Sequence, residues 1–284
     1  MFWYDLCSTD NRTVDTGSLQ FQPLVEALRS HRDDGTLAAL YECKEAAMTG
    51  FFVDRATYIS VLNRVTIGMV VRDLEDSGDK NEMELIHLVR ILEETDRTIS
   101  RMNEKIEDYY LALSPSGLTD SKRNIWGIVQ NFAVSRDHPL HAVSRDLMRL
   151  RESRTHLAVF IRQKAEETIP NMSALCGPLV ASRLLSTAGS KKHLASMSST
   201  SLQVLGAGPS LFSHLVSGTK PPKHGLIYEF KGIHNSGRKV RGRVSRVVAC
   251  QLSIAARIDF FRVSRDDEFI RKAGERISRA GGEK

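Results

Sequence analysis

A basic segment in the last third of the chain carries the residues whose types and spacing point to chemistry. It begins at the turn Pro221–Gly225 (Pro-Pro-Lys-His-Gly) and ends at the alanine-rich stretch Val247–Ile258, whose apolar pattern predicts a buried helix. Between them lies a basic, glycine-containing segment that includes Arg238, Lys239, Arg241, Arg243 and Arg246. Cationic side chains at a turn beside a rigid helix predict a grip on phosphate groups. The alternative is an ordinary solvated basic loop beside a core helix.

Motifs for other chemistries are missing from the sequence. No Gly-x-x-x-x-Gly-Lys-Ser/Thr loop occurs, and Gly206–Pro209 lacks the third glycine of a dinucleotide-binding motif. The nine histidines show no metal-binding spacing, and the four cysteines (Cys7, Cys43, Cys176 and Cys250) form no Cys-x-x-Cys pair. We therefore expect no enzymatic activity, no cofactor and no metal site, and we expect reduced, buried thiols.

Charge is distributed unevenly along the chain. The formal net charge is +6, yet residues 170–284 hold 19 Lys or Arg against 7 Asp or Glu, and no acidic residue lies between Glu167 and Glu229. Residues 1–169 hold 21 basic against 27 acidic residues. This polarity predicts that the carboxy-terminal part contacts a polyanion and that the amino-terminal part has another task.

Two long segments with apolar residues at regular spacing, here called seams, precede the basic segment, and we expect them to position it. The first runs from Leu85 to Leu113 and the second from Leu140 to Ile161, both in steps of three and four residues with charged residues between them. A segment bounded by prolines connects the two seams. We predict an antiparallel coiled-coil hairpin about 45 Å long, from a rise of about 1.5 Å per helical residue.

The remaining segments complete the predicted domain plan. Residues 1–79 combine short apolar runs, an amphipathic stretch at Leu19–Ser30 and β-branched residues, which together predict a small mixed α/β domain. The polar run 76–80 predicts a linker. The segment Ser186–Gln203 is rich in serine, but its recurrent apolar residues predict packed helices instead of a tether. Residues 263–284 predict a charged helical tail that frays.

Six pieces of the carboxy-terminal part lie in a fixed order between residues 170 and 259. They read PNMSALCGPLVASRLLSTAGS (170–190), SLQVLGA (201–207), LF (211–212), GTKPPKHGLIY (218–228), GRVSR (242–246) and LSIAARID (252–259). In order and spacing they resemble the Nop domain of the archaeal and eukaryotic box C/D guide-RNA ribonucleoprotein scaffold, whose relatives include a spliceosomal protein. Six pieces that match in the same order and at similar spacing are far more specific than any single motif.

The resemblance implies a fold and a set of partners. The fold is mainly α, with a small α/β domain (1–79), the coiled-coil hairpin (80–168), an all-α Nop domain (169–262) and the charged tail (263–284). In the family the Nop domain binds kink-turn RNA together with a ribosomal-type kink-turn-binding protein, the amino-terminal domain docks fibrillarin, and the coiled coil forms a homodimer. The implied function is a non-enzymatic scaffold that positions the fibrillarin methyltransferase for RNA 2′-O-methylation.

The RNA-contact residues that we predict are cations on or near the basic segment. They are Lys220, Lys223, His224, Arg241, Arg243 and Arg246, together with Arg183 and Lys192. Lysine and arginine donate to phosphate oxygens, and His224 either does the same, stacks on a base, or is a capping or core histidine. Arg257 either contacts RNA or forms an ion pair with Asp259.

The predicted protein-interface residues lie mainly on the first seam. They are Leu85, Leu88, Leu92, Ile99, Met102 and Ile106, with Phe212 outside the hairpin. Apolar residues on the outer sides of the hairpin, such as Ile91 and Phe160, either pack on the flanking domains or mediate self-association. Phe212 either anchors the core of the Nop domain or faces the partner protein.

Three positions depart from the family pattern, and two alternative functions stay open. Gly208 and Pro209 replace a pair that is usually acidic then basic, and Ser213 replaces a common arginine, so the contacts of those charges are in question. The alternatives are a spliceosomal-type protein bound to another kinked RNA and a coiled-coil nucleic-acid-binding regulator. Without a membrane-length apolar run or a signal peptide, we expect a cytoplasmic protein in an archaeal-type cell, or a nucleolar one in a eukaryote.

Overall fold

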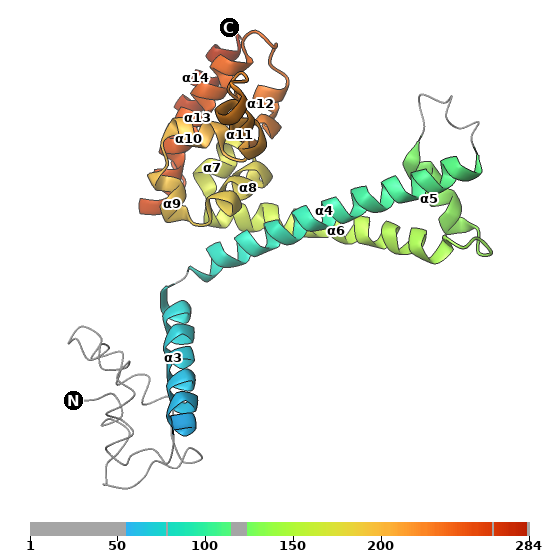
Figure 1. Cartoon of the computed structure of the whole chain (residues 1–284). Coiled ribbons are helices and arrows are strands. Elements are labelled where there is room, and N and C mark those ends of the chain that lie inside the picture. Colours follow the sequence, from blue (N-terminus) through green and yellow to red (C-terminus); the bar gives the residue numbers. More distant parts are fainter. Residues whose placement is uncertain (1–54, 78, 115–123, 263, 283–284) are drawn as a thin grey trace. The chain divides into compact units, whose positions relative to one another are not determined.

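The computed structural model of the chain describes residues 55–77, 79–114, 124–262 and 264–282. These residues are mainly helical, so the prediction of a mainly α fold is confirmed for them (Figure 1). The chain divides into two units, Met1–Gly78 and Asp79–Lys284, which are described separately. None of the described helices is long and apolar enough to cross a membrane.

The described part of the first unit is helix α3 (Arg55–Ser77). Its buried side chains Tyr58, Val61, Val65 and Met69 recur every three or four residues, which places them on one helical face. The β-branched residues of this run therefore belong to a helix, and the mixed α/β prediction is not supported here. The amphipathic stretch at Leu19–Ser30 and the other short apolar runs before residue 55 lie outside the described residues.

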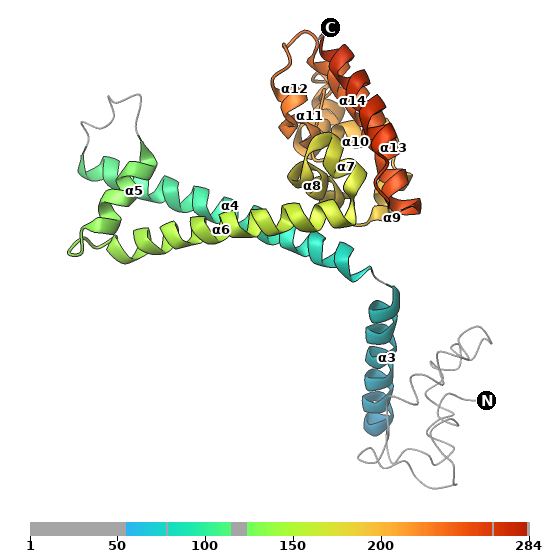
Figure 2. The ribbon, with the colours of Figure 1, turned by 180° about the vertical axis from the view of Figure 1, so that it is seen from behind.

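Helices α4 (Lys80–Leu113) and α6 (His141–Thr168) run antiparallel along one another and form an arm (Figures 1 and 2). The short helix α5 (Ile125–Val134) lies at the far end of the arm. Along the arm, Arg154 donates two hydrogen bonds of 2.7 and 3.0 Å to the carboxylate of Asp96. This pair explains how an arginine fits into the second apolar seam, because its charge is neutralised by the facing helix.

The two ends of the arm have separate apolar cores. At the far end a small cluster consists of Ile106, Val129 and Leu147, with Trp126 and Phe132 packed against it. At the base, Leu85, Leu92 and Ile161 belong to the same core as the carboxy-terminal helices. The arm is therefore anchored in the carboxy-terminal domain, and one continuous core extends across the predicted boundary at residue 168.

The carboxy-terminal domain consists of short helices around one long helix. In chain order they are α7 (Pro170–Cys176), α8 (Pro178–Ala188), α9 (Lys191–Ser196), α10 (Ser199–Val204), α11 (Gly208–Ser217), the 3-10 helix η5 (Leu226–Glu229), α12 (Lys231–His234), α13 (Arg241–Phe261) and α14 (Asp267–Gly281). The hydroxyls of Ser190 and Ser198 accept backbone hydrogen bonds at the starts of α9 and α10. The serine-rich segment is thus helical, as predicted, because its serines cap helices.

Helix α13 runs through the middle of this domain. Its residues Val248, Leu252 and Ala255 are fully buried, and α7, α9, α10, α12 and α14 all contact it. Helix α14 packs through one apolar face that includes Ala273 and Ile277, both buried. The predicted charged tail is therefore helical, but one side of it belongs to the core of the domain instead of fraying.

A buried carboxylate near the end of α13 ties three helices together. Asp259 accepts hydrogen bonds from the backbone amides of Asn171 (2.9 Å) and Met172 (3.0 Å), and from the Asn171 side chain (2.8 Å). These amides lie in the first turn of α7, where a helix leaves its donors without partners. Asn171 Oδ1 accepts from the amide of Asp266 at the start of α14. The Arg257–Asp259 ion pair is not formed, because Arg257 donates to the carbonyl oxygen of another helix.

Replacing Asp259 with alanine is expected to lower the free energy of unfolding by about 3 kcal/mol or more, since three buried donors lose their acceptor. Urea unfolding followed by circular dichroism measures the change. Asp267→Ala, which removes an exposed carboxylate from the first turn of α14, is the matched control and is expected to cost less than about 1 kcal/mol. Similar losses in the two variants would contradict the role of Asp259.

Candidate nucleic-acid interface

The loop with the Pro-Pro-Lys-His-Gly sequence is attached to the end of α10 through its backbone. The amides of Gly225 and Leu226 donate to the carbonyl oxygens of Gln203 and Leu205, each at 2.8 Å, and the Gln203 side chain donates to the carbonyl oxygen of Lys223 at 2.8 Å. The two backbones approach so closely that a β-carbon at residue 225 would lie 2.0 Å from the Leu205 oxygen. Only glycine fits there, and this close contact holds Lys223 in place.

Beside this loop, two histidines, a tyrosine and an arginine form a stacked cluster. The rings of His224 and Tyr228 are stacked with centroids 4.4 Å apart, and His234 packs on Tyr228 at 5.3 Å. The Arg241 guanidinium lies 5.2 Å from the centre of the Tyr228 ring and donates to the carbonyl oxygen of His234. Partial burial lowers the pKa of His224, and the charges of Arg241 and Lys223 lower it further. These contacts fix the side chains of the cluster in one conformation, and the cluster presents a positive, partly aromatic surface.

Several predicted contact residues have charged groups without a partner in the described part of the chain. Lys220, Lys223 and Arg246 are exposed, and no described residue forms an ion pair or hydrogen bond with their charged groups. A β-carbon on Gly242 would lie 3.7 Å from Lys223 Cδ, so Lys223 reaches the first turn of α13. The partial positive charge of that helix end adds to the field of these cations. Lys192 is also exposed, on α9.

Two other predicted contact residues are engaged within the chain. Arg243 donates two hydrogen bonds, 3.1 and 2.9 Å long, to the carbonyl oxygen of Ala280 in the last turn of α14. Arg183 forms an ion pair with Glu229 and lies 3.7 Å from a carboxylate oxygen of Asp96. The charges of Arg243 and Arg183 therefore hold helices together, and we do not count them among the free cations.

Helix α11 presents apolar side chains to solvent. Phe212, Leu215 and Val216 are 69%, 74% and 67% exposed, and none of the ten described residues of this helix is buried. Pro209 lies in its first turn, and Gly218 ends it in the left-handed conformation. Of the two interpretations of Phe212, the structure shows the exposed one, and the neighbouring side chains extend it into an apolar patch.

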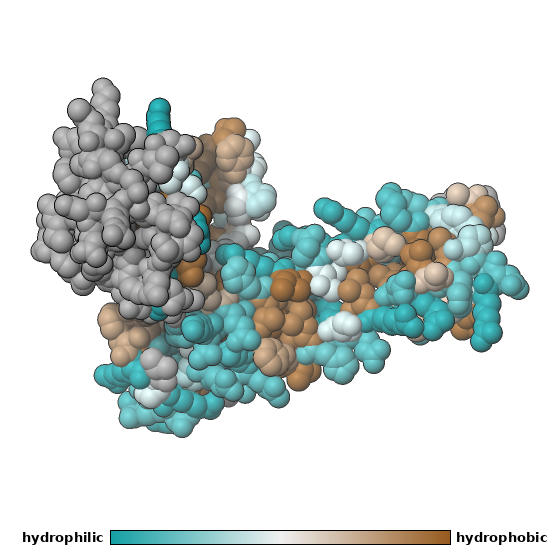
Figure 3. Space-filling model, turned by 90° about the horizontal axis from the view of Figure 1, so that it is seen from below, coloured by the Kyte–Doolittle hydropathy of each residue, from teal (hydrophilic) through white to brown (hydrophobic). Residues whose placement is uncertain are grey.

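The seam residues predicted for self-association are used inside the chain. Leu85 and Leu92 are buried in the base core with Leu88 packed against it, and Ile106 is buried in the far cluster with Ile99 and Met102 packed against it. These seam residues are therefore not available for the predicted self-association, and the exposed apolar residues of the arm lie on its outer sides. There, Ile91, Val159 and Phe160 are 55%, 46% and 47% exposed, and Figure 3 shows apolar side chains gathered along the arm.

Part of this surface was not predicted from the sequence. Tyr228 is only the last residue of the piece GTKPPKHGLIY in the sequence comparison, although an aromatic residue between two histidines is a signal for a stacked cluster. Leu215 and Val216 were not singled out, although they follow Phe212 at helical spacing. The pattern shows that these residues share a face, but it does not show whether that face is covered.

Two features of the described residues bear on metal binding and thiol chemistry. None of them form a group of three or more His, Cys, Asp or Glu that is able to hold a metal ion. Burial raises the pKa of the Cys176 thiol far above its ordinary value, so this cysteine stays protonated. The arrangement is suited to holding a polyanion beside an apolar contact surface.

Gly225→Ala is expected to displace the loop and to lower the free energy of unfolding by about 2 kcal/mol, because its methyl group overlaps the Leu205 carbonyl oxygen. The ring proton shifts of His224, which report its stacking on Tyr228, should change in the same variant. Gly237→Ala is the matched control, since a β-carbon there has its nearest neighbour at 4.0 Å. An unchanged His224 environment in Gly225→Ala would contradict the close contact.

Comparison with known proteins identifies the family. The family model described as "Nop: snoRNA binding domain, fibrillarin" matches residues 66–280. An uncharacterized NOP5 family protein of Methanocaldococcus jannaschii is 37% identical over 134 residues, which cover 47% of this chain and 32% of that protein. Nucleolar protein 56 of Caenorhabditis elegans is 40% identical over 129 residues, which cover 44% and 26% of the two chains.

A solved structure agrees with this assignment. The crystal structure of a fibrillarin/Nop5p complex contains a chain that superposes with a TM-score of 0.53 at 25% sequence identity, over 78% of this chain and 79% of that one. The matched segments span less than a third of the length of the curated relatives. Because the family model covers well over half of its residues, the protein belongs to the Nop family.

Proposed function

We propose that this chain is a non-enzymatic scaffold of a box C/D guide-RNA ribonucleoprotein. The observation that carries the proposal is a set of exposed cations without described partners, Lys220, Lys223 and Arg246, of which Lys223 lies on the glycine-dependent loop and Arg246 on α13, in a domain whose family is described as snoRNA-binding. The domain would bind kinked RNA together with a ribosomal-type kink-turn-binding protein. The relatives named nucleolar protein 56 and the fibrillarin/Nop5p complex support this choice.

The RNA would be gripped by its phosphates. A-form RNA has a deep, narrow major groove that side chains do not enter, so recognition depends on shape and on the backbone. Flexible lysines such as Lys220 and Lys223 act as point charges toward phosphate oxygens without requiring a fixed geometry. The stacked His224 and Tyr228 would keep this part of the surface rigid, which reduces the entropy lost on binding.

The bound protein would be recognised by α11. This helix has no acidic or arginine side chain, and its exposed Phe212, Leu215 and Val216 offer an apolar contact surface. The family charges that Gly208, Pro209 and Ser213 replace are missing here, so the contact would rely on apolar burial. Aromatic anchors of this kind commonly contribute most of the binding energy of a small interface.

The remaining parts of the chain would serve assembly. Two copies would pair through the outer sides of the arm, where Ile91, Val159 and Phe160 are exposed. Residues 1–79 would dock fibrillarin, by analogy with the family. The scaffold would contribute proximity, holding the methyltransferase over the guided 2′-hydroxyl, and no bond-making group of its own.

Neutralising the free cations tests the RNA grip. The triple variant Lys220→Gln, Lys223→Gln, Arg246→Gln is expected to weaken assembly on a kink-turn RNA with its bound protein by about tenfold or more at low salt, and to reduce the slope of log affinity against log salt by about 3. Fluorescence anisotropy over a salt series measures both quantities.

The matched control removes the same charge from the exposed side of α14, through Arg271→Gln, Lys272→Gln and Arg276→Gln. Its affinity is expected to stay within about threefold of the unmodified protein, because screening weakens distant charges. If the two triple variants weaken assembly equally, only net charge matters and the proposed grip is wrong.

Phe212→Ser tests the apolar contact of α11. The exposed side chain contributes little to folding, so stability should be retained, while affinity for RNA carrying the kink-turn protein should fall by about tenfold or more. Phe261→Ser is the matched control, since Phe261 is 75% exposed at the end of α13. An affinity unchanged in Phe212→Ser would remove α11 from the interface.

A further inference from the structure

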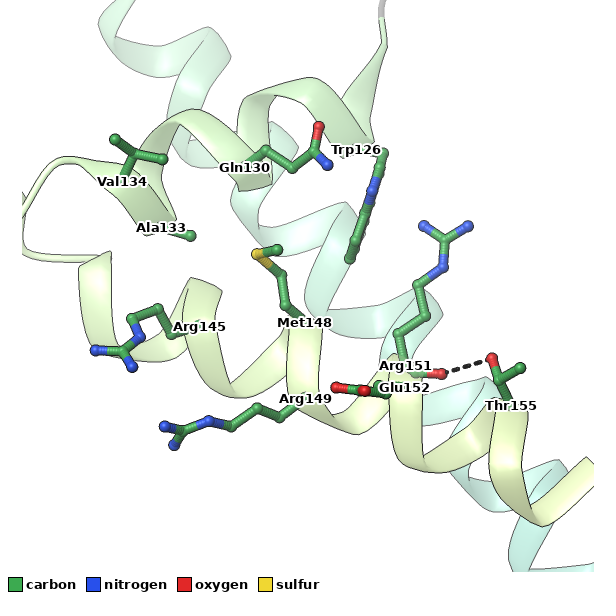
Figure 4. Close-up of a pocket in the computed structure, with 10 residues that line it drawn as sticks. All are labelled: Trp126, Gln130, Ala133, Val134, Arg145, Met148, Arg149, Arg151, Glu152 and Thr155. Carbon is green, nitrogen blue, oxygen red and sulfur yellow. Dashed lines mark hydrogen bonds between the residues drawn. The ribbon is translucent and has the colours of Figure 1, made fainter.

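A cleft lies at the far end of the arm, between α5 and α6, remote in sequence from the basic segment. Its volume is about 750 Å³, a size typical of binding pockets. Figure 4 shows Trp126, Gln130 and Met148 pointing into it, with Ala133 and Val134 at one end. Val134 is 79% exposed, so this part of the apolar wall is open to solvent.

The two walls of the cleft differ in chemistry. Helix α5 (IWGIVQNFAV) contributes no charged residue, whereas α6 contributes Arg145, Arg149 and Arg151 against a single acidic lining residue, Glu152. The guanidinium of Arg151 lies 4.1 Å from the centre of the Trp126 ring, and this cation-π contact fixes the orientation of the ring in the cleft. The cleft therefore has an apolar floor, and the arginine side chains of α6 form a cationic rim around it.

We propose that this cleft docks an amphipathic helix with acidic residues from a protein partner. Helix-in-groove recognition uses apolar side chains at i, i+3 or i+4 and i+7 of the docked helix, with charged residues at its edges. At about 1.5 Å per residue, the ten residues of α5 provide a wall about 15 Å long, enough for about three turns of such a helix. Acidic edge residues complement the arginine rim.

The lining favours a protein over RNA as the occupant. One face of Trp126 is already covered by Arg151, which leaves less ring surface for a base to stack on. Ala133, Val134 and Met148 offer no hydrogen bond to a base edge. An apolar side chain of the docked helix packs against the α5 wall, and its flanking carboxylates pair with the arginines of the α6 wall.

The test uses the full chain with Trp3→Phe, so that Trp126 is the remaining tryptophan and its emission reports the cleft. The probe is a helical peptide of about 15 residues, with leucine at i, i+4 and i+7 and glutamate at its edges. Saturable binding with a shift of Trp126 emission is the expected result. The same peptide with lysine in place of glutamate, and a short RNA duplex, are expected to give no such shift.

Three variants locate the binding. Val134→Asp, at an exposed position, and the double variant Arg145→Glu, Arg149→Glu are each expected to weaken binding of the acidic peptide by about tenfold or more. The matched control reverses the same charge on α4 through Arg90→Glu and Arg101→Glu, and should change the affinity by less than about threefold.

Three results would overturn the proposal. The first is failure of the acidic peptide to bind, and the second is equal weakening by the α4 control, which would mean a general charge effect. The third is an emission shift with the RNA duplex that is lost in Arg145→Glu, Arg149→Glu, which would assign the cleft to nucleic acid. Each of these outcomes leaves the proposed kink-turn assembly untouched, because that assembly uses the other end of the second unit.

Discussion

The burial of α13 on nearly all sides is the constraint on which the arrangement of the second unit depends. Valine, alanine, serine and leucine at its buried positions let five neighbouring helices approach it. Each neighbour then fixes part of the surface. The end of α10 holds the Pro-Pro-Lys-His-Gly loop through backbone hydrogen bonds. Asp259 of α13 accepts hydrogen bonds from α7, and Arg243 of α13 donates hydrogen bonds to the last turn of α14. A side chain larger than serine at Ser245 or Ala255 would separate elements that define the candidate interface.

The structure separates arginines that build the fold from cations that face solvent. Arg154, Arg183 and Arg243 each meet a carboxylate or a carbonyl oxygen of another helix. A planar guanidinium with several donors suits such fixed contacts, whereas lysine suits a mobile contact with phosphate. The excess of positive charge after residue 170 therefore overstates the charge that is free to contact an anionic partner, and Lys220 and Lys223 form a larger share of what remains.

What the sequence predicted well depends on short-range patterns. The two seams of the hairpin follow from helical spacing, and the serine-rich helices follow from capping and recurrent apolar residues. The engagement of Arg243 was not predictable, because its acceptor is a backbone oxygen 37 residues away. The packing of α14 and the exposure of Phe212 depend on whether a neighbour covers an amphipathic face, and sequence periodicity is identical in both cases.

In the proposed assembly, the departures at Gly208, Pro209 and Ser213 would shift the contact made by α11 from charge pairing to apolar burial. Without those charges, α11 presents an almost purely apolar surface, while the lysines of the loop present an almost purely electrostatic one. A single small contact surface gives weak binding. If RNA and protein are joined to one another as proposed, the second contact would form at a high effective concentration, and the affinities of the two weak contacts would multiply. In the proposed assembly, such a division would favour the joined complex over free RNA or free protein, and specificity would come from the requirement that both be present together.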